Sequence, residues 1–254
     1  MERSVYDNMA KLDEQHWWYV ARRDILDRLI RRRIDLPKGA RILEIGCGTG
    51  HNLPMLGRFG EVDAIEIDAG ARAIASQRLG KPVMASPLPA LEGVADGAYD
   101  LVAILDVLEH IEADREALTG IAAKLKPGGR ILITVPAHPW MWSAHDVVNH
   151  HKRRYTRRTL KAVIAAAGLR LDMLRWFNSL LFPVAAGVRL AGRLFGKEGG
   201  DDTMPPKPVN FLFGKIFALE RHAIGRLPMT PGVSLAAIVS VPGEPGPGDS
   251  GSAR

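Results

Sequence analysis

The feature that most constrains the fold is a glycine-rich turn between an apolar segment and a helical one. Residues 41–45 (RILEI) form a short predicted strand, and residues 46–50 (GCGTG) follow with glycine at every second position. Glycine lets the backbone turn sharply and approach a ligand where a side chain would collide. The dinucleotide-binding fingerprint G-x-G-x-x-G would need glycine at position 51, where this chain has His51. The turn therefore predicts a ligand-binding site at the end of the first strand, but one that differs from the dinucleotide-binding type.

Apolar segments alternate with helical ones along the chain, which predicts a parallel sheet covered on both faces. The predicted strands after the first span residues 62–67, 82–85, 99–105, 130–135, 169–177 and 233–241, and the predicted helices span 15–34, 52–59, 69–79, 115–125 and 156–167. We expect an α/β, doubly wound, Rossmann-like and mostly parallel sheet of seven strands, with a helical insert before the last strand.

We expect one domain over residues 1–241. It would comprise an N-terminal helical cover (1–36), a Rossmann-like core (41–177), an apolar and amphipathic insert (178–232) and the last strand (233–241). Residues 242–254 are rich in Pro, Gly and Ser, which predicts a disordered tail.

Composition excludes several classes of protein. One cysteine rules out a disulfide framework and a multi-cysteine zinc site. The acidic and aromatic first 18 residues contain no apolar signal core, so we expect a protein that is not secreted and is cytoplasmic. No stretch approaches the roughly 20 apolar residues of a membrane span.

An acidic residue ends the second predicted strand, 20 residues after the first glycine of the turn. Glu66 could there accept hydrogen bonds from both ribose hydroxyls of an adenosine ligand. The alternative, a plain tight turn followed by a surface glutamate, is disfavoured by the strand context and by Glu44 beside the turn.

Three blocks of this sequence resemble the class I S-adenosylmethionine-dependent methyltransferases of the small-molecule type. They are LEIGCGTG (43–50), YDLVAILDVLEHI (99–111) and LKPGGRILITVP (125–136), in the order and spacing of that family. The resemblance implies S-adenosylmethionine as cofactor and the Rossmann-like fold. It is specific for the class and carries little information on the methyl acceptor.

The resemblance also implies the cofactor contacts. Glu44 belongs to the glycine turn, whose glycines would lie under the methionine part of the cofactor, and Leu105 would lie beside the sulfonium. Many relatives have an acidic residue after the third strand, whereas this chain has only Ser86 as a polar candidate near the adenine. The full set of implied cofactor-binding residues is Glu44, Gly46, Gly48, Gly50, Glu66, Ile67, Ser86 and Leu105.

The candidate catalytic residues are Asp106, His145 and Tyr155. Asp106 follows the strand 99–105, and the other two lie in the loop 136–155, which leaves the carboxyl end of the fifth strand, where ligands bind in open α/β sheets. A base is needed only if the acceptor is protonated, as a hydroxyl or an ammonium is. We predict no metal ligands, because methyl transfer does not require an ion. The alternatives are a metal site at His145, Asp146, His150 and His151, or a purely structural role for the loop.

Basic charge concentrates before the insert. Residues 151–175 contain eight Lys or Arg side chains against Asp172 alone, a net charge of +7, whereas the whole chain carries +6. Such a patch favours an anionic partner or a solvated helix face. In residues 177–197, Arg189, Arg193 and Lys197 repeat at helical spacing among apolar residues, which fits peripheral contact with the inner face of a membrane, a pocket lid or core packing.

Three functions therefore compete. We expect a methyltransferase acting on oxygen or nitrogen of a small or lipid-like molecule. The alternatives are an RNA methyltransferase, suggested by the basic segment but disfavoured by the apolar insert, and a non-catalytic S-adenosylmethionine-binding interaction protein. The sequence does not fix an oligomeric state.

Overall fold

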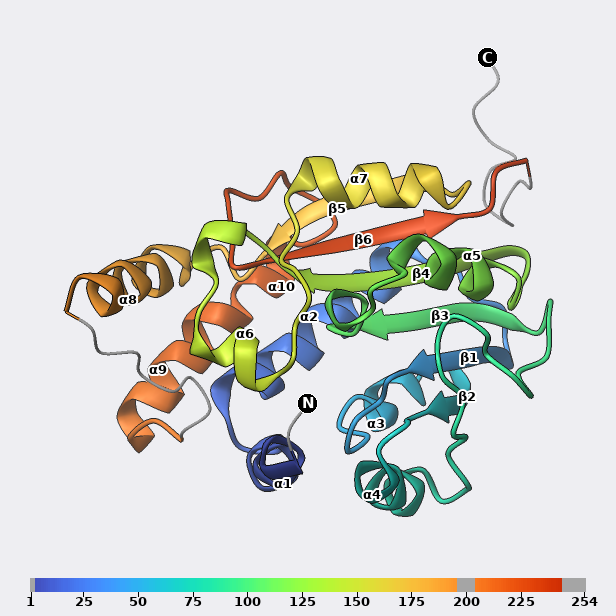
Figure 1. Ribbon diagram of the computed structural model, residues 1–254, viewed down its shortest axis with the longest axis horizontal. Coiled ribbons are helices and arrows are strands. Elements are labelled where there is room, and N and C mark those ends of the chain that lie inside the picture. Colours follow the sequence, from blue (N-terminus) through green and yellow to red (C-terminus); the bar gives the residue numbers. More distant parts are fainter. Residues whose placement is uncertain (1–2, 196–203, 244–254) are drawn as a thin grey trace.

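A six-stranded sheet forms the centre of the molecule in the computed structural model, which describes residues 3–195 and 204–243 (Figure 1). The strand order is β2-β1-β3-β4-β6-β5. The strands are β1 (Ala40–Ile45), β2 (Gly60–Ile65), β3 (Tyr99–Leu105), β4 (Leu125–Pro136), β5 (Arg170–Phe177) and β6 (Ser234–Ser240). The first four pair in parallel, and β6 runs antiparallel to both β4 and β5. The predicted α/β Rossmann-like class is confirmed.

The prediction of seven strands is wrong for the described residues, because the segment 82–85 does not form a full strand. It pairs with the sheet at a single position, where Met84 forms an isolated parallel bridge to Ile65. Met84 donates its N–H to Ala64 and accepts from Glu66, but Pro82 has no N–H to extend the ladder.

Helices cover both faces of the sheet. Their bounds are α1 (Arg3–Leu12), α2 (Trp17–Arg33), α3 (Leu53–Leu56), α4 (Ala69–Leu79), α5 (Asp114–Ala122), α6 (Ala144–Val148), α7 (Arg157–Ala166), α8 (Phe182–Phe195), α9 (Lys207–Ala218) and α10 (Glu220–Ala223), with 3-10 turns η1 (Leu108–His110) and η2 (Pro139–Met141). Thr156 caps α7, where its hydroxyl accepts the N–H of Thr159 at 3.1 Å. The helix predicted over 52–59 is shorter, because only 53–56 is α-helical.

Successive strand residues point to opposite faces, and both faces are buried. In β3, Leu101 and Ala103 belong to a core cluster that includes α2, α3 and α9, whereas Val102 and Ile104 belong to a second cluster with α5 and α7. This two-sided burial explains why the central strands are apolar throughout.

The segment between β5 and β6 is helical and contains α8, α9 and α10. The helix α9 packs against α2, where Trp17 contacts the rings of Phe213 and Phe217. In Figure 1, α8 extends away from the end of the sheet. The predicted tail falls largely on residues 244–254, which lie outside the described residues. The predicted domain boundaries stay a prediction.

Candidate functional site

The glycine turn lies at the carboxyl end of β1, between the ends of β2 and β3, because Ile45 pairs with both Ile65 and Ile104. Its glycines all adopt positive φ angles, 67° at Gly46, 56° at Gly48 and 84° at Gly50. A Cβ atom at Gly46 would lie 2.6 Å from a methyl carbon of Val107. The turn therefore requires glycine for its conformation and for its close packing.

Glu66 holds this turn to the end of β2. Its side chain is buried, and its two carboxylate oxygens accept the N–H groups of Gly48 and Asp68, each at 2.8 Å. A carboxylate has about four acceptor positions. Gly48, Asp68 and Tyr6 occupy three of them, so one position remains for a ribose hydroxyl, and displacement of Tyr6 would open a second. The sequence predicted the ribose role, but not that Glu66 also shapes the glycine turn.

The N-terminal helix α1 lies against the same turn. A Cβ atom at Gly48 would lie 3.2 Å from the sulfur of Met9, and Tyr6 hydrogen-bonds to Glu66. Asp13, just after α1, is fully buried, where it accepts from Thr49 at 3.0 Å and pairs with Arg78 at 2.6 Å. These contacts place α1 as a cover over the predicted cofactor site.

Glu44 lies beneath the turn. One carboxylate oxygen accepts from Asn52 at 2.8 Å, and burial raises the pKa of Glu44 to about 7 despite this hydrogen bond. Asn52 lies between the glycine turn and α3, so its hydrogen bond joins the carboxyl group of Glu44 to the segment that follows the turn.

The remaining predicted cofactor contacts surround this turn. Ile67 follows Glu66 with 68% of its side chain exposed, whereas Leu105 at the end of β3 is buried. Ser86 is buried and donates its hydroxyl to the carbonyl of Glu92, so its side chain already has a partner.

Asp106 follows β3 with a positive φ angle of 58° and forms an ion pair that the sequence analysis did not predict. Its carboxylate accepts from the guanidinium of Arg22 at 2.6 Å. Arg22 comes from α2, is 1% exposed and also donates to Thr134 at 3.0 Å. The apolar spacing of residues 15–34 does not indicate that one of its arginines, Arg22, is buried at the end of the sheet.

The two other candidate catalytic residues lie in different surroundings. His145 is on α6, where its Nε2 lies 3.4 Å from the amide nitrogen of Asn149. Tyr155 is buried in the second core cluster and donates its hydroxyl to Asp114 at 2.7 Å, and burial and this hydrogen bond raise the pKa of its phenol. The structure does not place the phenol in contact with Asp106 or His145.

A second group of titratable side chains lies where the loop 136–155 returns to the end of β3. Glu109 and His110 belong to η1, and His151 follows α6. Burial and the neighbouring Asp106 raise the pKa of Glu109 well above its usual range, and burial lowers the pKa of His110 to about 3. The sequence did not predict Glu109 and His110 as site residues, because in the block 99–111 only Leu105 and Asp106 follow directly from the strand end and the family resemblance.

Half of the basic segment 151–175 is paired within the protein. Four of its eight basic side chains form ion pairs, Lys152 with Glu112, Arg153 with Asp114, Arg154 with Asp146 and Arg170 with Asp172. These partners reduce the positive charge that the segment presents to solvent.

The chain matches the methyltransferase domain family over residues 16–174, which is more than half of its length. It belongs to this family. The predicted class I S-adenosylmethionine-dependent methyltransferase domain, with S-adenosylmethionine as its cofactor, is thereby confirmed.

A curated relative agrees with this assignment, and solved structures share the fold. The chain is 30% identical over 126 residues to a mitochondrial ubiquinone biosynthesis O-methyltransferase of Schizosaccharomyces pombe, covering 47% of this chain and 46% of the relative. It therefore spans about half the length of that relative. Its fold is similar to an S-adenosylmethionine-dependent methyltransferase from Archaeoglobus fulgidus, with a TM-score of 0.54, 22% identity and coverage of 85% and 93%. It is also similar to the geranyl diphosphate C-methyltransferase of Streptomyces coelicolor, solved with S-adenosyl-L-homocysteine, with a TM-score of 0.55, 12% identity and coverage of 84% and 78%.

Proposed function

We propose that this protein transfers a methyl group from S-adenosylmethionine to an oxygen or nitrogen atom of a small or lipid-like molecule. The observation that carries the proposal is the position of Glu66 and the glycine turn, joined by a hydrogen bond at the carboxyl ends of β1 and β2. Ligands bind at this edge in open α/β sheets. An oxygen acceptor is favoured by the O-methyltransferase among the relatives.

We expect the residues at this edge to hold the cofactor, with Tyr6 and Met9 of α1 moving to admit it. The turn of Gly46, Gly48 and Gly50 would hold the methionine part, Glu66 the ribose, and Ile67 and Ser86 would lie against the adenine. Leu105 and Asp106 would lie beside the sulfonium. When bound, the cofactor supplies an activated methyl group with a neutral leaving group, so the protein contributes mainly alignment and exclusion of water.

The paired basic side chains support a small acceptor over RNA. Single-stranded RNA recognition needs free cationic and stacking side chains, and four cations of the segment 151–175 are bound by carboxylates.

Transfer of a labelled methyl group from S-adenosylmethionine into a fractionated lipid and metabolite extract tests this function. We expect a labelled product in a small-molecule fraction, which mass spectrometry would identify together with the methylated atom. Label in the RNA fraction, or cofactor binding without any transfer, would contradict the proposal.

Glu66→Gln should weaken binding of S-adenosylhomocysteine about 10-fold, because the ribose loses a charge-assisted hydrogen bond of about 1.5 kcal/mol. The amide oxygen can accept one of the N–H groups of Gly48 and Asp68, while the amide NH2, a donor, loses the bond to the other; alanine would leave both N–H groups without a side-chain acceptor. Calorimetry measures the affinity, and the exposed Glu61→Gln is the control. Unchanged affinity would exclude Glu66 as the ribose ligand.

We also propose that α8 and α9 form a peripheral contact with an anionic membrane surface. None of the described helices is long and apolar enough to cross a bilayer. The two helices nevertheless expose apolar side chains, including Val188 at 59% and Phe211 at 66%. Neither helix contains an acidic residue, while Arg189 and Lys215 supply positive charge. Of the basic stripe predicted from the sequence, the Arg193 side chain and Lys197 lie outside the described residues.

The protein should float with vesicles that contain phosphatidylglycerol, bind neutral vesicles poorly and dissociate as salt increases. Arg189→Glu should weaken this binding, since each basic residue near an anionic surface contributes about 1 kcal/mol. The control is Arg58→Glu, which changes an exposed arginine between α3 and β2. Equal binding to neutral and anionic vesicles, or none, would instead favour a pocket lid and soluble acceptors.

A further inference from the structure

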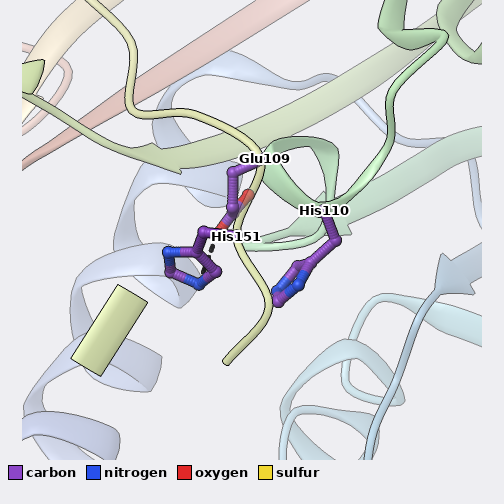
Figure 2. A group of neighbouring side chains, drawn as sticks. All are labelled: Glu109, His110 and His151. Carbon is purple, nitrogen blue, oxygen red and sulfur yellow. Dashed lines mark ion pairs between the residues drawn. The ribbon is translucent and has the colours of Figure 1, made fainter. Parts of the chain in front are cut away.

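Three side chains at the carboxyl end of β3 bring metal-ligating atoms together. Glu109, His110 and His151 each offer one ligand atom, and these atoms lie within 4.8 Å of one another. Figure 2 shows the two imidazole rings on either side of the loop, with the Glu109 carboxylate directed at His151. We propose that they form a site for a divalent metal ion of the zinc type, which binds the acceptor oxygen.

The Glu109 carboxylate is available to an ion. Its side chain is 1% exposed, and among the described residues its Oε2 has no hydrogen-bond partner. Buried polar atoms are nearly always satisfied, so an unpaired carboxyl oxygen that lies beside two histidine nitrogens points to a missing ligand. Its other oxygen lies 4.0 Å from Nε2 of His151, a separation that no direct hydrogen bond spans.

His151 is oriented as metal-bound histidines are. Its Nδ1 lies 2.8 Å from a carboxylate oxygen of Asp146, so that Nε2 faces Glu109. Asp146 is fully buried and is itself fixed by Arg154 at 2.7 Å and by the N–H of Ser143 at 2.9 Å. A carboxylate that accepts from the second ring nitrogen sets the tautomer and orientation of a ligating histidine.

His110 completes the group from the opposite side. Its ring lies edge-on to His151, with 4.6 Å between the ring centres, and the backbone of Asn149 hydrogen-bonds to it. Both histidines are therefore held by contacts outside the group, and the site needs only a small closure. Ligand atoms about 2.1 Å from a tetrahedral ion stand about 3.4 Å apart, against the 4.0 Å between Glu109 and His151 and separations of up to 4.8 Å across the group, so the ligands would move together by about 1 Å on binding.

The donor set selects the class of ion. Two imidazole nitrogens and one carboxylate oxygen suit zinc, cobalt or iron better than magnesium or calcium, which prefer oxygen ligands throughout. Three protein ligands leave a coordination position open, as in catalytic rather than structural zinc sites. Of the alternative metal ligands predicted from the sequence, His145, Asp146, His150 and His151, the structure brings only His151 into the ligand group.

The chemical role rests on the proposed methyl transfer to oxygen. A hydroxyl group bound to the ion has a lower pKa and loses its proton to solvent water. The resulting oxyanion attacks the methyl carbon, so that the O–C bond forms, the C–S bond breaks and its electron pair goes to sulfur. The ion would thus replace a protein base, and neither His145 nor Tyr155 would be needed for that step.

Metal binding to the full-length, chelator-treated protein tests the site without any measurement of activity. We expect calorimetry with Zn²⁺ to give about one site per chain, and Co²⁺ to give a visible absorption band of a low-coordinate complex. Glu109→Gln and His151→Gln should abolish the band and weaken Zn²⁺ binding by more than the roughly 10–100-fold loss typical of an outer-shell change.

Matched controls are Glu112→Gln, an exposed carboxylate three residues from Glu109, and His222→Gln, an exposed histidine on α10. Both should bind Zn²⁺ as the parent protein does. Circular dichroism and S-adenosylhomocysteine binding establish that each variant is folded. If Glu109→Gln does not fold, His110→Gln gives the same test.

Three results would overturn the metal site. They are the absence of saturable Zn²⁺ binding, a Zn²⁺ affinity that the ligand variants leave unchanged, and tighter binding of Mg²⁺ than of Zn²⁺. If no metal site is found but methyl transfer occurs, the proposed function stands and only the metal site is contradicted. If the metal binds but no methyl transfer occurs, only the proposed function is contradicted.

Discussion

Asp106→Asn should lower the free energy of unfolding by about 3 kcal/mol, because the buried Arg22 then loses its only carboxylate within hydrogen-bonding distance among the described residues. Arg22 is 1% exposed, and its remaining side-chain acceptors are neutral, Thr134 at 3.0 Å and Asn52 at 3.4 Å. Removing one partner of a buried pair typically costs about 3–5 kcal/mol. The lower end applies, because the Asp106 side chain is 25% exposed and asparagine still offers an oxygen.

Asparagine is the appropriate replacement, because Asp106 has a positive φ angle that asparagine tolerates better than most residues. Urea unfolding measures the effect. The single variant Arg22→Met and the double variant Arg22→Met with Asp106→Asn complete a double-mutant cycle. The double variant should be more stable than Asp106→Asn alone, since the unpaired charge is gone. A loss below about 1 kcal/mol would mean that solvent screens the pair.

This pair also bears on the predicted catalytic role of Asp106. If the carboxylate acts only by holding Arg22, then the double variant should recover stability and also cofactor binding. If Asp106 lies beside the sulfonium as proposed, cofactor affinity or turnover should stay reduced in every variant that lacks it.

The sequence predicted those parts of the molecule whose cause is local. The strand 99–105 was predicted with its observed bounds, because YDLVAIL is apolar except for Asp100, as is typical of a strand buried on both faces of a sheet. The helix 69–79 was likewise predicted from its composition, and in the structure Asp68 caps its start and Gly80 ends it in the left-handed conformation. The prediction of a strand at residues 82–85 was wrong, because Pro82 has no N–H group to donate and the segment pairs with the sheet only through a single bridge.

The side chains of the site were harder to predict, because their partners are distant in sequence. Arg22 meets a carboxylate 84 residues away, and His151 meets Glu109 only after the chain has passed through β4 and α6. The histidine-rich loop was recognised as a candidate site, but no periodicity indicates which of its histidines faces the sheet end. Tyr155 of the same loop was predicted to be catalytic, whereas in the structure its hydroxyl donates a hydrogen bond to a carboxylate oxygen of Asp114.

Glu44→Gln should stabilise the protein at pH 8 by up to about 3 kcal/mol and have little effect at pH 4.5. The Glu44 carboxyl is 1% exposed, and burial raises its pKa from 4.5 to about 7. Below pH 4.5 the group is protonated in both the folded and the unfolded chain, so its burial involves no charge. Between pH 4.5 and 7 the unfolded chain loses this proton first, and the free energy of unfolding therefore falls as pH rises. Above pH 7 the folded protein carries the full cost of a buried carboxylate.

Glutamine has nearly the same shape, and its amide oxygen can still accept from Asn52, so the variant removes the charge and leaves the packing intact. Denaturant unfolding at several pH values measures the difference between the two proteins, which should grow from pH 4.5 to 7 and then remain constant. The control is Glu61→Gln on β2, whose side chain is 70% exposed and should give no such pH-dependent gain. A constant difference across the whole pH range would mean that the folded protein ionises Glu44 as easily as the unfolded chain does. Arg22 and Asn52 would then stabilise Glu44 as an anion. Glu44 would hold the glycine turn as a charged group and not as a neutral hydrogen-bonding group.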